Sequence, residues 1–185
     1  MERNKINKIV FAITLGVWMI LFYAIMGIVE TVNLSSNTVE EAFEKFVDEK
    51  FGSNSNQTIK KEQKVYRRGN LIIVPFIIGE KLAFVEFQKG IFGWMQKRYT
   101  HSYSDNDDGY SATDDSNGDK ILYGVIPKNI LKQVKNIKVN GIYADIINVN
   151  GDKAFWLLVS IPDLYKNIKI EFLDGNGKVL AQENY

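Results

Sequence analysis

The feature that most constrains this chain is an uncharged apolar run near its N-terminus, Ile9–Val29. At about 1.5 Å of rise per residue, a helix of this length spans the roughly 30 Å hydrocarbon core of a bilayer. A long helix buried in a soluble core would normally show a polar stripe, and this run carries no charged residue. The run therefore predicts one membrane-spanning helix.

The charges that flank the run predict its orientation. Basic residues precede it at Arg3, Lys5 and Lys8, and the next lysine or arginine after it is Lys45. The positive-inside bias therefore predicts a cytoplasmic tail at residues 1–8, a transmembrane signal anchor at 9–29, a stalk at 30–37 and an extracytoplasmic C-terminal domain. The sequence thus indicates a single-pass protein of the cell membrane with a cytoplasmic N-terminus.

A cleaved signal peptide is the alternative to this anchor. Its apolar region usually has about 7 to 15 residues and is followed by a small-x-small cleavage site. Here the run is longer, and the segment Ala24–Met26 ends in a methionine. The sequence favours the uncleaved anchor but leaves cleavage open.

Composition bounds what the predicted external part can be. The chain has no cysteine, which excludes a lipoprotein anchor and means that the domain depends on its hydrophobic core rather than on disulfides. The 23 basic and 22 acidic residues nearly balance, so the chain has no general attraction for nucleic acid. An exported domain without cysteine is ordinary in bacteria.

Residues 38–103 predict a helix on an antiparallel sheet. Thr38 and Glu41 form a capping-box pattern, apolar residues follow at helical spacing, and Gly52 ends the segment. A helix along the membrane surface is the alternative, but its polar face is acidic. Strands are predicted at Glu62–Arg67, Leu71–Ile78, Lys81–Gln88 and Ile91–Ser102. Pro75 cannot donate to a ladder and predicts an edge or a bulge.

Residues 104–119 predict a long acidic loop that separates the two halves. Residues 120–185 then carry short strands divided by turn signals such as Asn140-Gly141. The predicted strands are Ile121–Ile126, Val134–Val139, Tyr143–Val149, Lys153–Ile161, Ile168–Leu173 and Lys178–Gln182. The expected fold class is α+β: an N-terminal transmembrane helix, a helix on an antiparallel sheet, and a small β-sandwich-like half in the general style of immunoglobulin domains.

Several stretches together resemble a group of small membrane-anchored or secreted proteins of Bacillus-type bacteria. The resemblance is carried by Phe84–Trp94, Leu122–Ile126, Val139–Ala144, Phe155-Trp156 and Asp174–Lys178. It covers residues 38 to 180 and implies a location in the cell envelope. These proteins have no characterised function, so the resemblance implies no activity.

The acidic loop contains a partial match to a calcium-binding loop. Aligning Gly109 with the glycine of such a loop places Asn106, Asp108 and Asp115 at ligand positions, because calcium takes oxygen ligands from alternating residues of a tight loop. The match is incomplete because Ser104 occupies the first position. The alternative is a solvated loop that faces the lysines of 128–138. We therefore expect no cofactor, with calcium as the open alternative.

A second candidate is the glycine-bracketed segment that contains Phe92 and Trp94. Aromatic residues at such a place can form a recognition surface, and they can equally be core residues beside a glycine bend. The basic segment 128–138 could meet an anionic wall polymer, although its lysines lack interleaved aromatic residues. Both segments are candidate binding surfaces.

The sequence contains little material for catalysis. The only histidine, His101, is expected on a strand, and its neighbours Thr100 and Ser102 then lie on the opposite face. We expect a non-enzymatic binding or assembly module of the bacterial cell envelope, with the membrane and an envelope protein or wall polymer as partners and no nucleic acid. The alternatives are an envelope hydrolase that uses paired carboxylates and a calcium-responsive adhesion domain.

Overall fold

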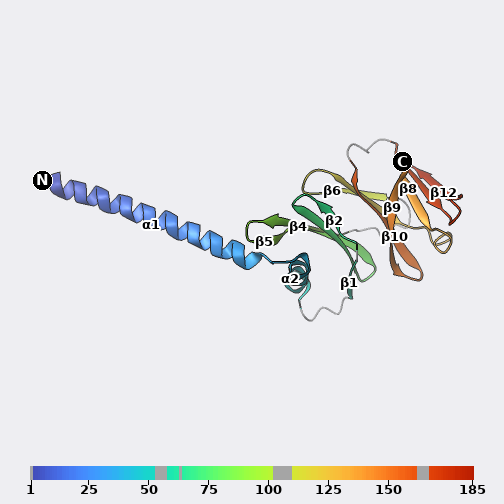
Figure 1. Cartoon of the computed structure of the whole chain (residues 1–185), viewed down its shortest axis with the longest axis horizontal. Coiled ribbons are helices and arrows are strands. Elements are labelled where there is room, and N and C mark those ends of the chain that lie inside the picture. The colour runs from blue at the N-terminus through green and yellow to red at the C-terminus, as the bar shows by residue number, and fades with distance from the viewer. Residues whose placement is uncertain (1, 53–57, 63, 102–109, 162–166) are drawn as a thin grey trace.

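The structure, a computed structural model, describes residues 2–52, 58–62, 64–101, 110–161 and 167–185. A long helix α1 (Glu2–Leu34) projects away from a β-rich body (Figure 1). Within the described residues, its segment Ile13–Leu34 is long and apolar enough to cross a membrane, and none of it is buried against the rest of the chain. The helix begins inside the predicted cytoplasmic tail and continues through residues 30–34, so the first part of the predicted stalk is helical.

Helix α2 (Val39–Phe51) forms where the capping pattern predicts it. The Thr38 hydroxyl accepts a hydrogen bond from the Glu41 amide at 3.1 Å, and the Glu41 carboxylate accepts one from the Thr38 amide at 3.4 Å. Gly52 ends the helix with a φ of +71°, and its N–H donates to the Asp48 carbonyl. The apolar face of α2 packs on a sheet through Val39, Ala42, Phe43 and Phe46.

That sheet has five antiparallel strands within the described residues, in the order β1-β3-β4-β5, with β2 also paired to β3. The strands are β1 (Ile59–Lys61), β2 (Tyr66–Arg68), β3 (Leu71–Ile78), β4 (Lys81–Gly90) and β5 (Gly93–His101). Residue alternation along β4 places Ala83, Val85 and Phe87 under α2, and Leu82 and Phe84 on the other face. Both faces of this sheet are therefore covered.

Pro75 lies inside β3 at a position where the sheet requires no backbone N–H donor. Strand β1 ends at Lys61 and β2 begins at Tyr66, so the neighbouring edge is interrupted opposite Pro75. The Pro75 carbonyl accepts from the Glu62 amide at 3.1 Å on this side. The proline thus behaves as the sequence predicts for an edge position, because its missing N–H faces the gap between two short strands.

The second half is a seven-stranded antiparallel sheet within the described residues, in the order β12-β11-β8-β9-β10-β7-β6. Its strands are β6 (Tyr110–Asp114), β7 (Lys120–Val125), β8 (Asn136–Val139), β9 (Ile142–Asn150), β10 (Lys153–Ile161), β11 (Lys169–Leu173) and β12 (Val179–Asn184). The sheet curls into a half-barrel around its own apolar core, in which Trp156 is fully buried with Ile170 and Phe172.

The two sheets share a third apolar layer. Leu82 and Phe84 of β4 pack against Tyr123 of β7 and Phe155 of β10, and the rings of Phe84 and Tyr123 lie 5.1 Å apart. The expected α+β class is therefore confirmed: an apolar N-terminal helix, a second helix on an antiparallel sheet, and a β-rich second half. The face-to-face packing of a sandwich occurs between these two sheets, while the second half itself is a single curled sheet.

Two segments differ from their predicted structure. Where a single strand is predicted at Glu62–Arg67, β1 ends before it at Lys61 and β2 shares only its last two residues, Tyr66 and Arg67. The second difference is in the acidic stretch. The acidic stretch 104–119 was expected to be a loop throughout, but Tyr110–Asp114 forms strand β6 at the edge of the half-barrel. Its residues pair with Lys120–Gly124 of β7. Pairing with a neighbouring apolar strand, and not its own composition, makes this segment a strand. The first part of the predicted loop, residues 104–109, lies outside the described residues.

Candidate functional site

The end of α1 is fixed directly to the folded part. Ser36 and Trp94 exchange two backbone hydrogen bonds, of 2.9 Å and 2.7 Å, as an antiparallel bridge on β5. Before it, the Ser35 hydroxyl donates to the Thr31 carbonyl at 2.5 Å and so satisfies part of the helix end. Only Ser35 separates α1 from the bridged residue, so the segment after the helix is held against β5.

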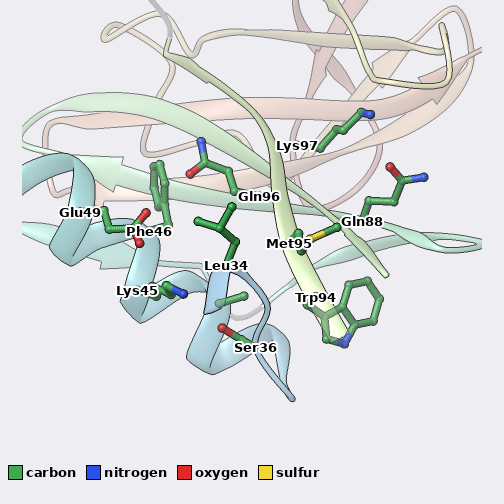
Figure 2. A pocket seen from close by; sticks show the side chains of 11 residues that line it. Leu34, Ser36, Lys45, Phe46, Glu49, Gln88, Trp94, Met95, Gln96 and Lys97 are labelled. Carbon is green, nitrogen blue, oxygen red and sulfur yellow. The ribbon is translucent and has the colours of Figure 1, made fainter. Parts of the chain in front are cut away.

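A pocket lies between α2 and β5 at this junction, and we call it the α2–β5 pocket. Its volume is about 390 Å³, within the usual range for small binding sites. The lining comprises Leu34, Ser36, Ala42, Lys45, Phe46, Glu49, Gln88, Trp94, Met95, Gln96 and Lys97. Figure 2 shows Leu34, from the end of α1, between Phe46 of α2 and Met95 of β5. The end of α1, the adjacent helix α2 and the distant strand β5 therefore form one site.

The lining combines an apolar surface with charged groups. Ala42, Phe46 and Met95 supply apolar contacts, while Lys45, Glu49 and Lys97 supply charges of both signs (Figure 2). The Lys45 ammonium also donates to the Asn33 carbonyl and so joins α2 to the last turn of α1. Such a lining suits a ligand with alternating apolar and polar groups.

Strand β5 contributes its backbone to the same site. Within the described strands β5 pairs only with β4, and its other edge carries the single bridge to Ser36. The N–H and C=O of Trp94 point to that open edge, because they bond to Ser36. The β4–β5 register is regular from Trp94 to Gln96, so the backbone groups of Gln96 point the same way. Among the described strands, the pocket therefore contains one unpaired edge position of β5, Gln96, before the register shifts at Lys97.

The structure separates the two aromatic residues that the sequence placed together. Trp94 is buried in the apolar layer beneath α2 and also lines the pocket, with Arg67 and Lys89 near its ring at 6.0 Å and 5.8 Å. Phe92 lies at the β4–β5 turn and is 41% exposed. Trp94 is thus both a core residue and a residue of the α2–β5 pocket, whereas Phe92 belongs to a different surface.

The three predicted metal ligands cannot be placed together. Asn106 and Asp108 lie outside the described residues. Asp115 is buried, and its Oδ1 accepts hydrogen bonds from the amides of Asn117 and Asp119 at 2.8 Å and 2.9 Å. Its other oxygen, Oδ2, is buried and has no hydrogen-bond partner among the described residues. The geometry at Asp115 is that of a turn-closing aspartate, and calcium binding by this loop stays a prediction.

Two buried acids, Glu86 and Asp115, lie at the interface of the two sheets in the described part of the chain. The Glu86 carboxylate accepts a hydrogen bond from the Ser116 amide at 2.9 Å and one from the Ser116 hydroxyl, and Arg98 lies 3.4 Å away. Neither acid lines any of the pockets described here. The paired-carboxylate alternative gains no geometric support from them, since Glu86 fixes the turn at Ser116 to the first sheet.

A second polar contact between the sheets involves Tyr66 and Asp145. The Tyr66 hydroxyl donates to the Asp145 carboxylate at 2.5 Å, and the Lys64 ammonium lies 2.7 Å from the same group. Burial, and then the neighbouring negative charge of Asp145, raise the pKa of Tyr66 far above its usual value. Burial also raises the pKa of Tyr123. The Tyr66 hydroxyl is therefore a structural donor at neutral pH.

The predicted basic surface forms the rim of another pocket. Lys132 and Lys135 line a space of about 430 Å³ between the turn after β7 and strand β9, together with Ile146 and Asn148. A neighbouring hollow of about 220 Å³ carries Lys128 and Lys153 beside Glu80 and Asp152. The first of these pockets is the described site best suited to an anionic polymer, whereas the second has mixed charge.

Several residues of the α2–β5 pocket carried no sequence signal. Lys45 and Glu49 belong to the polar face of an ordinary amphipathic helix, and Gln96 belongs to an ordinary strand. Their meeting depends on where the chain after α1 returns to β5. Gly93 was the available signal: a Cβ there would lie 2.4 Å from the Ser36 carbonyl oxygen, so a glycine marks the close approach.

Comparison of the chain with protein-family models, with curated proteins and with solved structures finds no match to any of them.

Proposed function

We propose that this chain is a membrane-anchored, extracytoplasmic binding or assembly module of the bacterial cell envelope, and that it binds an extended polypeptide segment in the α2–β5 pocket. The observation that carries the proposal is the open edge of β5 inside that pocket. The edge already accepts one extended residue, Ser36, through two backbone hydrogen bonds. A bound segment would continue this pairing along β5 by strand addition.

The charges and apolar groups of the pocket support a peptide as the ligand. Backbone groups of Gln96 supply main-chain hydrogen bonds, whose strength does not depend on the sequence of the peptide. Phe46 and Met95 offer contacts for apolar side chains, and Lys45, Glu49 and Lys97 offer ionic contacts that select among sequences. Affinity and selectivity therefore come from different parts of the same pocket.

Selection from a displayed peptide library on the full chain in lipid nanodiscs tests this proposal. We expect enriched peptides whose binding is lost in Gln96→Pro, because proline removes the outward N–H and is tolerated at a strand edge. The matched control, Gln96→Ala, keeps that N–H and should bind as the wild type does. Failure to enrich any peptide, or equal binding to both variants, would contradict strand addition. Ala42→Trp fills the pocket with a larger side chain. A lipid that co-purifies with the wild type but not with Ala42→Trp would instead show that the pocket binds lipid.

The location of the domain needs its own test. The residues before the apolar run are basic, which supports a cytoplasmic N-terminus. An alkaline phosphatase reporter, which is active only outside the cytoplasm, should be active when fused after Tyr185. A fluorescent protein that matures only in the cytoplasm, fused at the same position, should not fluoresce, because the C-terminal domain is exported. The reverse pattern would overturn the extracytoplasmic assignment.

A calcium-responsive adhesion domain is a second candidate, favoured by the buried Oδ2 of Asp115, which has no hydrogen-bond partner among the described residues. Calcium that binds the folded state raises its melting temperature, and the rise grows with the logarithm of the calcium concentration relative to the dissociation constant. Thermal unfolding of the full chain with and without calcium, and of Asp115→Asn as the matched control, separates this candidate from the first. An unchanged melting temperature of the wild type would dismiss calcium.

A further inference from the structure

We propose that the turn between β4 and β5, formed by Ile91 and Phe92, inserts into the surface of the same bilayer that α1 spans. The proposal rests on the anchoring by α1 and adds a second membrane contact to it. Ile91 is 96% exposed, the most exposed of the large hydrophobic side chains in the described part of the chain, and Phe92 beside it is 41% exposed.

The position of the turn supports a lipid partner. Gly93 touches the segment that follows α1, since a Cβ on it would lie 2.4 Å from the Ser36 carbonyl oxygen and 3.5 Å from the Ser35 Cβ. Figure 1 shows the β4–β5 hairpin as the part of the β-rich body that lies beside the end of α1. The exposed apolar pair is thus one or two residues from a point of contact with the segment that directly follows α1.

Distances along the chain show that the turn can lie at the depth of the lipid headgroups. The predicted apolar run ends at Val29, and Leu34 lies five residues further along the same helix, about 7 to 8 Å above the hydrocarbon. The headgroup layer extends about 5 to 7 Å beyond the hydrocarbon on each side. Ile91 lies two residues from Gly93, a reach of about 7 Å in an extended chain. The turn can therefore reach the headgroup layer without any change in the fold.

The residues around the turn suit an interface. Ordinary hairpin turns carry glycine, asparagine or aspartate, and here Gly90 and Gly93 bracket two large apolar side chains instead. Lys89 and Arg67 lie near the Trp94 ring, at 5.8 Å and 6.0 Å from its centre, so two cations stand close behind the turn. An apolar tip with cations behind it is the arrangement of proteins that insert shallowly into a bilayer.

Because the chain lacks cysteine, single cysteines can carry a spin label in the full chain. Ile91→Cys in nanodiscs of neutral and anionic lipid should collide more with dissolved oxygen than with a water-soluble nickel chelate, which reports lipid depth. Ile142→Cys, at an exposed isoleucine beside the β8–β9 turn in the half-barrel, is the matched control and should show the opposite preference. Ile20→Cys, within α1, reports the anchoring itself.

The three labels separate the possible failures. A label at residue 91 that prefers the nickel chelate, while the label at residue 20 prefers oxygen, would overturn the insertion of the turn and leave the anchoring intact. A label at residue 20 that prefers the chelate would overturn both. Both Ile91 and Ile142 are exposed, so neither substitution removes a core contact, and equal depth at these two positions would also overturn the proposal.

Discussion

At the scale of single residues, Gly93 determines how the membrane helix joins the folded part. Its φ of +128° lies in a region that residues with a side chain rarely adopt, and its missing side chain leaves room for the Ser36 carbonyl. Both conditions are met at one position, and the bridge between Ser36 and Trp94 depends on them. The residue is therefore a joint between two parts of the chain and not only a turn former.

Gly93→Ala should break this joint. The strained backbone and the clash with Ser36 should together cost about 1 to 3 kcal/mol of stability, and the amides of Ser36 and Trp94 should exchange hydrogen faster. Gly118→Ala is the control, because Gly118 has a φ of +86° but no atom within 4 Å of an added Cβ. If both variants left the Ser36 and Trp94 amides equally protected, the close contact would not hold the bridge.

Tyr66 predicts a loss of stability at alkaline pH. Its pKa is raised in the folded state by burial and by Asp145, so the folded chain keeps a proton that the unfolded chain releases above a pH of about 10. The stabilising effect is complete below that pH and is lost as the pH rises further. Urea unfolding between pH 8 and 11 should show a steeper decline for the wild type than for Tyr66→Phe.

The comparison with Tyr66→Phe isolates one group, since every other ionisable side chain is present in both proteins. A smaller decline should remain in the variant, because burial also raises the pKa of Tyr123. Parallel curves for the two proteins would show that Tyr66 titrates alike in the folded and unfolded states.

At the scale of elements, local sequence signals predict most helices and strands but not their partners. α2, β3 and β10 lie where capping residues, turn glycines and apolar runs place them, because those signals act within a few residues. β6 has no such signal in Tyr110–Asp114 and forms by pairing with β7. Strand order is also non-local: β7 pairs with β10, which is third after it along the chain. The half-barrel could therefore not be predicted.

The candidate site is less predictable for the same reason. Trp94 was singled out because glycines bracket it, and the structure places it in the pocket. Lys45 and Gln96 join it only because α2 and β5 are brought together by packing and by the return of the chain after α1. Sequence patterns describe faces of elements, whereas a pocket depends on which faces meet.

The capping box of α2 gives a prediction at this scale. Thr38→Ala removes the hydroxyl that accepts the Glu41 amide, and we expect a loss of about 1 kcal/mol, equivalent to a fall of about 2 to 4 °C in melting temperature. Thr38→Ser keeps the acceptor and should stay close to the wild type. A loss of similar size in both variants would mean that the methyl group, not the cap, supplies the stability.

At the scale of the whole molecule, the two sheets share one apolar interface. Phe84 of β4 and Phe155 of β10 belong to the apolar layer that both sheets share, and both are buried. The pairs Glu86–Ser116 and Tyr66–Asp145 add polar contacts across the same interface. Neither sheet covers this face by itself, so each needs the other to exclude water.

Phe84→Ala should therefore weaken both sheets together. The cavity should cost about 3 to 5 kcal/mol, and amides of β3 and β10 should lose the same protection against hydrogen exchange. Tyr143→Ala, at a side chain that is 62% exposed, should change stability by less than about 0.5 kcal/mol. Unchanged protection of β10 in Phe84→Ala would show that the half-barrel is stable without the first sheet.

The link of one residue between α1 and the bridge at Ser36 has a mechanical consequence. Because only Ser35 lies between α1 and the bridge, the linker leaves little freedom for the helix to rotate relative to the folded part. A transmembrane helix answers a thinner bilayer by leaning further from the membrane normal. In the proposed membrane-anchored state the folded part leans with α1, so the thickness of the bilayer would set the angle at which the folded part meets a partner.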